Sequence, residues 1–189
     1  MDGLEGRTQH VILETNRLRF ATWIREDWKE FQKIATDPLV VRYLGTGEPW
    51  PEERTREFVD RQCENWEKYG ICLWKVLPKE SDELIGICGL QHLPEGPDVE
   101  IGWWLAPAYW GQGLATEAAH QALAYGFDLC KLDRIVAIAQ AANRDSLRVM
   151  EKIGMRFERE AIHKGIRVVL YAIMREHYDA AKAKGEVRA

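Results

Sequence analysis

Two glycines ahead of a helix-forming segment are the most informative residues for chemistry in this chain. An apolar, aromatic run ends at Pro107, Gly111 and Gly113 follow, and a segment with Glu117 in its first turn begins near Thr116. A strand, a glycine-rich turn and a helix N-terminus form a phosphate site, because backbone N–H groups there can point at an anion without side-chain obstruction. The stretch therefore predicts a phosphorylated ligand; taken alone, the two glycines also fit a plain strand-to-helix turn.

Two common nucleotide-binding motifs do not fit this stretch. A P-loop needs a lysine directly after its second glycine, but Leu114 and Ala115 follow Gly113. A dinucleotide fingerprint needs a third glycine or alanine at a fixed spacing close to an early strand, whereas this stretch lies mid-chain. Both classes of nucleotide site are therefore disfavoured.

Composition indicates a single domain with an ordinary core. The chain has 189 residues, of which 46% are hydrophobic, and its net charge is −4. This charge disfavours a broad nucleic-acid surface, and no apolar run approaches the ~18 residues of a membrane span. We expect a cytoplasmic protein with a loose leader over residues 1–10, one domain over 11–178 and a tail over 179–189.

The cysteines show no metal-ligand spacing. None forms a C-x-x-C pair or lies near a histidine at zinc spacing, so we expect reduced thiols and no metal site. The four are Cys63, Cys72, Cys88 and Cys130.

The hydrophobic pattern predicts an α+β fold, with a mixed, mostly antiparallel sheet flanked by helices. The predicted order is β-α-α-β-β-β-α-β-α-β-β, and the three middle strands form an antiparallel meander. Predicted strands cover 11–23, 71–77, 84–93, 99–105, 134–139, 157–163 and 168–176, and predicted helices cover 26–36, 52–69, 116–129 and 143–153.

Two longer strings carry a resemblance to a known family. They span residues 100–118 and 143–155 and lie about 25 residues apart. With both strings in this order, the chain resembles the GNAT superfamily of acyl-CoA-dependent N-acetyltransferases over about residues 11–178, and most closely its RimJ/RimL-type branch. The resemblance implies the GNAT-like acyl-CoA N-acyltransferase fold, with acetyl-CoA as cosubstrate.

The resemblance also implies where the cofactor binds. The family's pyrophosphate loop corresponds to residues 110–115, with Trp110 where the family has glutamine or arginine. The implied pyrophosphate contacts are Gln112, Gly113, Leu114, Ala115 and Thr116. The implied pantetheine track is the preceding strand end at Trp104, Leu105 and Ala106, where an N–H near Leu105 faces the thioester oxygen and stabilises an oxyanion.

Glu100 is the predicted base, acting directly or through water, because a carboxylate near tryptophan side chains has a raised pKa. The alternative is a structural acid paired to a nearby arginine or lysine. Some members of the family have a glutamate base where this chain has Ile138, and many have a tyrosine general acid where it has Met150. Ser146 is the nearest hydroxyl to take the place of that tyrosine. Asn143 and Ser146 either cap their helix, contact the cofactor, or do both.

The acceptor is a primary amine whose identity is weakly marked. A protein N-terminal α-amine, with a pKa of ~7.7–8.0, is easier to deprotonate than lysine at ~10.4. The family's acceptor groove corresponds to residues 44–51, so Glu48 and Trp50 are candidates, as is His92. A small-molecule amine such as an antibiotic, polyamine or amino acid, and a non-catalytic CoA-binding module, are the alternatives; the chain is expected to be a monomer or homodimer.

Overall fold

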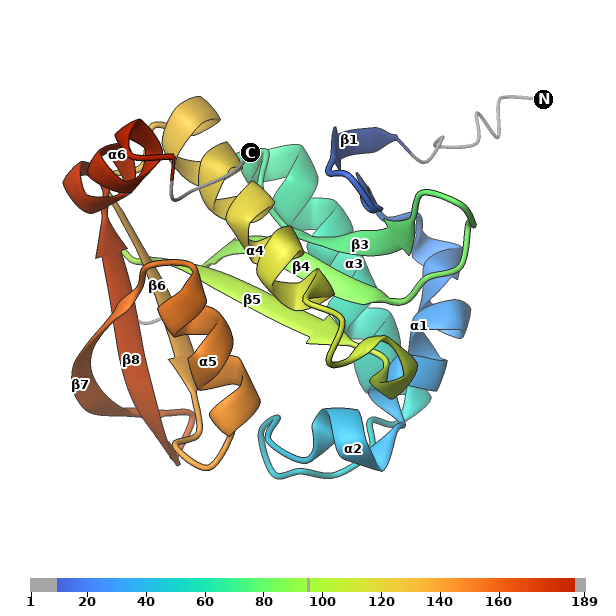
Figure 1. Ribbon diagram of the computed structural model, residues 1–189. Helices are drawn as coiled ribbons and strands as arrows, with labels where there is room; N and C mark the ends of the chain where they lie inside the picture. Colours follow the sequence, from blue (N-terminus) through green and yellow to red (C-terminus); the bar gives the residue numbers. More distant parts are fainter. Residues whose placement is uncertain (1–9, 95, 186–189) are drawn as a thin grey trace.

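The fold is built on one eight-stranded sheet, seen in the computed structural model of residues 10–94 and 96–185 (Figure 1). The strand order is β1-β2-β3-β4-β5-β6-β8-β7, and all neighbours are antiparallel except β5 and β6, which are parallel. The strands are β1 Val11–Glu14, β2 Leu18–Ala21, β3 Leu73–Pro78, β4 Gly86–His92, β5 Val99–Leu105, β6 Arg134–Ala139, β7 Arg156–His163 and β8 Ile166–Met174. The predicted fold class and the central meander are confirmed.

Helices cover both faces of the sheet (Figure 1). α4 and α5 lie over one face, and α1 and α3 lie over the other. The α-helices are α1 Trp28–Ala35, α2 Pro38–Val41, α3 Glu52–Tyr69, α4 Leu114–Ala124, α5 Arg144–Lys152 and α6 Arg175–Ala183. α3 has the predicted bounds, and it ends because Gly70 adopts the left-handed conformation at φ 68°. Among the described residues, no helix combines the length and hydropathy needed to cross a bilayer.

The structure departs from the prediction at two places near the N-terminus. The predicted strand 11–23 is a hairpin of β1 and β2, because the Thr15 hydroxyl accepts a hydrogen bond from the Leu18 N–H (3.0 Å) and reverses the chain. A short helix that was not predicted, α2, begins at Pro38 after the first predicted helix has ended. The Asp37 carboxylate accepts from the Leu39 N–H (2.8 Å), and Pro38 occupies the first turn, where no N–H is needed.

The C-terminal segment also departs from the prediction. Residues 175–183 form α6, where we expected the end of a strand and the start of a tail. Tyr178 anchors this helix: its side chain is 1% exposed, and its hydroxyl donates to Asp128 (3.0 Å). The predicted leader, apart from His10, and the last four residues of the predicted tail lie outside the described residues.

An aromatic cluster fixes the end of β5 against the two helices on its face. The Trp104 ring stacks on Phe31 of α1 (6.0 Å between centroids) and on Phe58 of α3 (5.8 Å). Trp50 meets the same ring edge-on at 4.9 Å. Such pairs stabilise by ~0.5–1.5 kcal/mol each beyond area burial, so the helices hold this strand end rigidly.

Replacing Phe31 with alanine tests this cluster. Phe31 is fully buried, so Phe31→Ala should lower the free energy of unfolding by about 3–5 kcal/mol through lost burial and a cavity. Urea denaturation measures the change. Leu39→Ala is the control, because Leu39 is 56% exposed and its loss should change stability by less than about 0.5 kcal/mol. Equal losses in the two variants would contradict the role of the cluster.

Candidate active site

The central feature of the site is an open edge along β5. The Ala106 N–H donates to the Ile85 carbonyl (2.8 Å), and the β4–β5 register continues without a shift to Val99. Since successive residues of a strand point their backbone groups to opposite neighbours, Trp103 and Leu105 direct their N–H and C=O groups away from β4, toward β6. β6 pairs with β5 at Glu100 and Val136; beyond that point no further β5–β6 pair occurs in the described chain.

The open edge separates the three residues predicted for the pantetheine track. Leu105 turns its N–H toward the open side, whereas the Ala106 N–H already bonds to β4. Trp104 also faces β4 with its backbone, and its ring belongs to the aromatic cluster. Trp103 was not among the predicted contacts, although its backbone faces the same open edge as that of Leu105. The alternation along a strand indicates Trp103 only when the neighbouring strand is known. The predicted contacts themselves stay predictions.

The beginning of α4 presents unpaired N–H groups. Gly111 and Gly113 have φ of 73° and 76°, left-handed values that side chains disfavour. The helix starts at Leu114, two residues earlier than predicted, and its first backbone bond runs from the Glu117 N–H to the Gly113 carbonyl (3.0 Å). The N–H groups of residues 114–116 therefore project from the helix start, which suits an anion.

Side chains within the loop set its shape. The Trp110 indole N–H donates to the Leu105 carbonyl (2.7 Å), which ties the loop to the end of the open edge. The Gln112 side-chain amide donates to the Ala108 carbonyl (2.9 Å). Trp110, the departure from the family pattern, thus has a structural role, and the Gln112 amide nitrogen is engaged inside the loop.

Arg17 is a site residue that the sequence did not reveal. From the β1–β2 turn, its guanidinium donates to the Gln112 carbonyl (3.0 Å) and to the Glu117 carboxylate (2.7 Å). The Thr15 hydroxyl donates to the same carboxylate (2.6 Å). Burial tends to raise the pKa of Glu117, but these hydrogen bonds outweigh it, and the pKa lies below its usual value. Arg17 thus places a positive charge beside the anion site and links it to the sheet edge.

The start of α5 confirms the predicted cap. The Asn143 side chain accepts from the Ser146 N–H (3.2 Å), so Asn143 is the N-cap. Met150 is buried, and its thioether has no proton to donate. Gln140, at the end of β6, donates to the Tyr43 and Gly45 carbonyls (3.2 and 3.4 Å), which ties this end to the loop after α2. Contacts of Asn143 and Ser146 with a cofactor stay predictions.

Glu100 is a buried carboxylate with a neutral partner. It is 8% exposed, and its Oε2 accepts a hydrogen bond (2.8 Å) from the side-chain amide of Gln91, the residue opposite it on β4. Burial raises its pKa to about 7, while the Gln91 hydrogen bond and the charge of Lys164 act in the opposite direction. In the described structure this carboxylate forms no ion pair within salt-bridge distance, unlike a structural acid paired to a cation. It therefore gains and loses a proton near neutral pH.

The structure brings together only part of the predicted acceptor set. Trp50 is 6% exposed beside Trp104, with the Arg54 guanidinium over its ring (4.2 Å), and Glu48 is exposed on the same loop. His92 lies at the opposite end of β4 from the position that pairs with Trp104, and its ring packs on Tyr69 (4.8 Å). His92 is therefore not grouped with Trp50.

Other chemistry is weakly represented. Across the described chain, no cluster of three histidine, cysteine, aspartate or glutamate side chains is placed to hold a metal ion. All four cysteines are free, and burial raises the pKa of the fully buried Cys88 thiol.

Comparison with known proteins assigns the family. The model of the acetyltransferase (GNAT) domain matches residues 17–156. The chain belongs to the GNAT acetyltransferase family. The uncharacterized N-acetyltransferase YnaD of Bacillus subtilis is 34% identical over 174 residues, covering 88% of this chain and 99% of YnaD. A GNAT-family acetyltransferase structure from Bacillus anthracis is 34% identical at a TM-score of 0.73, covering 87% and 98%.

The fold also matches that of a more distant acetyltransferase. The structure of RimL, a ribosomal L7/L12 α-N-protein acetyltransferase in complex with coenzyme A, has a TM-score of 0.74 at 16% identity and covers 87% of this chain and 98% of RimL. This GNAT protein is an acetyl-CoA-dependent N-acetyltransferase acting on an amine. The site suits acetyl-CoA, since projecting N–H groups at α4 fit a pyrophosphate and the open edge of β5 fits the amides of a pantetheine arm.

Arg17→Gln should weaken CoA binding about ten-fold or more, because it removes the charge and the bond to Gln112 that hold the anion site. Calorimetric titration with CoA measures this. Arg25→Gln is the matched control: it removes an equally short ion pair, to Asp60 (2.6 Å), at a similarly exposed position away from the loop. Unchanged CoA affinity in Arg17→Gln would contradict the assigned role.

Proposed function

We propose that this enzyme acetylates protein N-terminal α-amines, with Glu100 as the base. The start of α4, at Gly113, Leu114, Ala115 and Thr116, holds the CoA pyrophosphate. The open edge of β5, at Trp103 and Leu105, holds the pantetheine arm. Acetyl-CoA supplies the activated acetyl group when bound. The observation that carries the proposal is a buried carboxylate of near-neutral pKa on the same strand as this open edge.

Glu100 reaches the reaction along one face of β5. Glu100, Gly102 and Trp104 share this face, and Gly102 adds no side chain between the other two. At about 3.3 Å per residue, the separation calls for ordered water between the amine and the carboxylate. The carboxylate takes the proton that the attacking amine must lose, and Gln91 keeps the carboxylate oriented.

The pKa of Glu100 favours one class of acceptor. Proton transfer from an α-ammonium, with a pKa of ~7.7–8.0, to a base near 7 is uphill by about 1 kcal/mol. The same transfer from a lysine ammonium at ~10.4 is uphill by about 4.5 kcal/mol. An α-amine is thus deprotonated more readily by this base. Trp50 and Glu48 are proposed to line the acceptor side.

Ser146 is proposed to stabilise the departing sulfur. Its N–H is held by Asn143 at the start of α5, where the helix N-terminus favours negative charge. A thiol has a pKa of ~8.5, so a thiolate leaves readily near pH 7 and a hydrogen bond from a hydroxyl suffices. A stronger acid is not required at Met150.

A panel of acceptors tests the substrate class. Thiol release from acetyl-CoA is measured with a lysine-free peptide bearing a free α-amine, with an Nα-acetylated peptide containing one lysine, and with a polyamine. We expect kcat/KM for the α-amine peptide to exceed that for the lysine peptide by at least ten-fold. A polyamine or lysine peptide as the best acceptor would contradict the proposed class.

Glu100→Gln tests the base. In the wild type, kcat/KM should rise with pH through an inflection near 7, because the deprotonated carboxylate is the active form. Glu100→Gln should lower the rate by about 10²–10⁴-fold and remove this inflection, while CoA affinity stays within about two-fold. The acceptor's own inflection remains in both profiles. Glu160→Gln, an exposed carboxylate on β7, is the control. An unchanged profile in Glu100→Gln would remove Glu100 from this role.

A further inference from the structure

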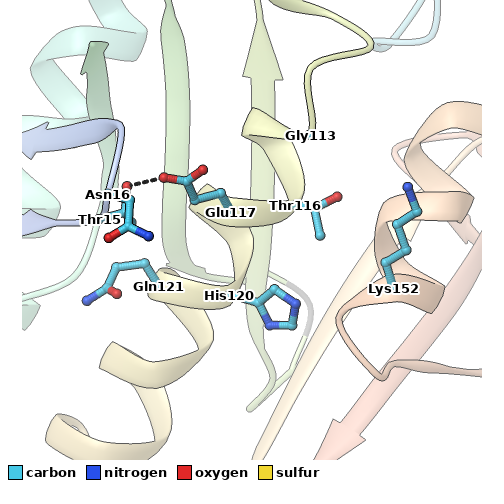
Figure 2. Close-up of a pocket in the computed structure, with 8 residues that line it drawn as sticks. All are labelled: Thr15, Asn16, Gly113, Thr116, Glu117, His120, Gln121 and Lys152. Atoms are coloured by element: carbon cyan, nitrogen blue, oxygen red, sulfur yellow. Dashed lines mark hydrogen bonds between the residues drawn. The ribbon is translucent and has the colours of Figure 1, made fainter. Parts of the chain in front are cut away.

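A groove of about 350 Å³ adjoins the anion site (Figure 2). It runs from the β1–β2 turn at Asn16, across the first turns of α4, to Lys152 at the end of α5. Gly113 lies at its edge, so the groove is continuous with the projecting N–H groups of α4. Its volume falls at the lower end of the range for small-molecule sites.

The part of the groove between α4 and α5 carries hydrogen-bond donors on one helix and a positive charge on the other. Thr116 and His120 lie four residues apart on α4 and so share a face, and the Lys152 side chain stands opposite them on α5 (Figure 2). No ion pair involving Lys152 occurs in the described part of the chain, and its side chain is exposed. Its ammonium is therefore available to an anion.

His120 has a nitrogen that the protein itself leaves without a partner. Its Nδ1 is buried and has no hydrogen-bond partner within the described structure. Burial lowers the pKa of His120, so the ring is neutral at pH 7. Since a buried N–H without an acceptor is rare, the proton belongs on Nε2 of this groove-lining ring. His120 then offers one donor toward the side where Lys152 lies.

The other side of the groove does not repel an anion. The charge of the Glu117 carboxylate there is balanced by its ion pair with Arg17, and the Thr15 hydroxyl donates a hydrogen bond to the same carboxylate. Asn16 and Gln121 add neutral amides. The groove therefore has a neutral side and a cationic side, as expected for a ligand that combines a heterocycle or sugar with a phosphate.

We infer that Lys152 and His120 bind the ribose 3′-phosphate of CoA and make the enzyme select CoA over 3′-dephospho-CoA. The inference rests on the proposed placement of the pyrophosphate at α4. With the pantetheine arm leading to β5, the adenosine end leaves the pyrophosphate in another direction, and the groove begins there, at Gly113. A phosphate monoester carries a charge of about −1.5 to −2 at pH 7, which matches a free ammonium with an adjacent neutral donor.

Binding of two ligands to two variants tests the inference. Calorimetry compares CoA with 3′-dephospho-CoA on the wild type and on Lys152→Met, which keeps the length of the side chain and removes its charge. The wild type should bind CoA about ten-fold or more tightly than 3′-dephospho-CoA. In Lys152→Met this ratio should fall to within about two-fold, through loss of CoA affinity alone.

Matched variants keep the test specific. Arg148→Met removes another exposed positive charge from α5, one paired with Asp145, and should keep the wild-type ratio. Lys152→Arg should also keep most of it. A wild type that binds both ligands equally, or a Lys152→Met variant that loses affinity equally for both, would overturn the inference and leave the proposed function standing. Failure of both ligands to bind the wild type would overturn the proposed function as well.

Discussion

The site depends on a strand, β5, that is fully paired on one side and only partly paired on the other. β5 is bonded to β4 over its whole length, but it meets β6 at Glu100 and Val136 and then has no further pairing with it. Unsatisfied N–H and C=O groups of a strand edge attract an extended partner. The aromatic cluster around Trp104 keeps this edge rigid from one face, and Trp110 links its end to the start of α4. One constraint thus places the open edge of β5 and the start of α4 in continuity.

Burial of Glu100 connects this architecture to chemistry. A carboxylate in this position with a cationic partner would stay ionised, whereas the Gln91 amide stabilises the charge only in part. The same fold therefore supplies a buried carboxylate whose pKa is near neutral. The negative charge of Glu117, at the start of α4, is instead paired with Arg17 and hydrogen-bonded by Thr15. The helix start therefore remains favourable to an anion.

Local patterns predicted much of the fold but few of the long-range contacts. The bounds of α3 and β6 follow from apolar spacing and a terminating glycine, and Gly111 and Gly113 marked the turn before α4. Arg17 lies about one hundred residues from the loop it holds, and a single sequence contains no signal of that proximity. The open backbone groups of β5 could not be predicted either. The register with β4 decides which N–H groups of residues 103–106 are free, and no local sequence pattern encodes that register.

The alternating edge of β5 provides the most direct test of the account. Amide hydrogen exchange by NMR, with and without CoA, reads each N–H separately. Without CoA, the amides of Trp104 and Ala106 should exchange slowly and those of Trp103 and Leu105 faster; with CoA, Trp103, Leu105 and residues 114–116 should gain protection. Protection by CoA that spares Trp103 and Leu105 would contradict the proposed binding along the open edge.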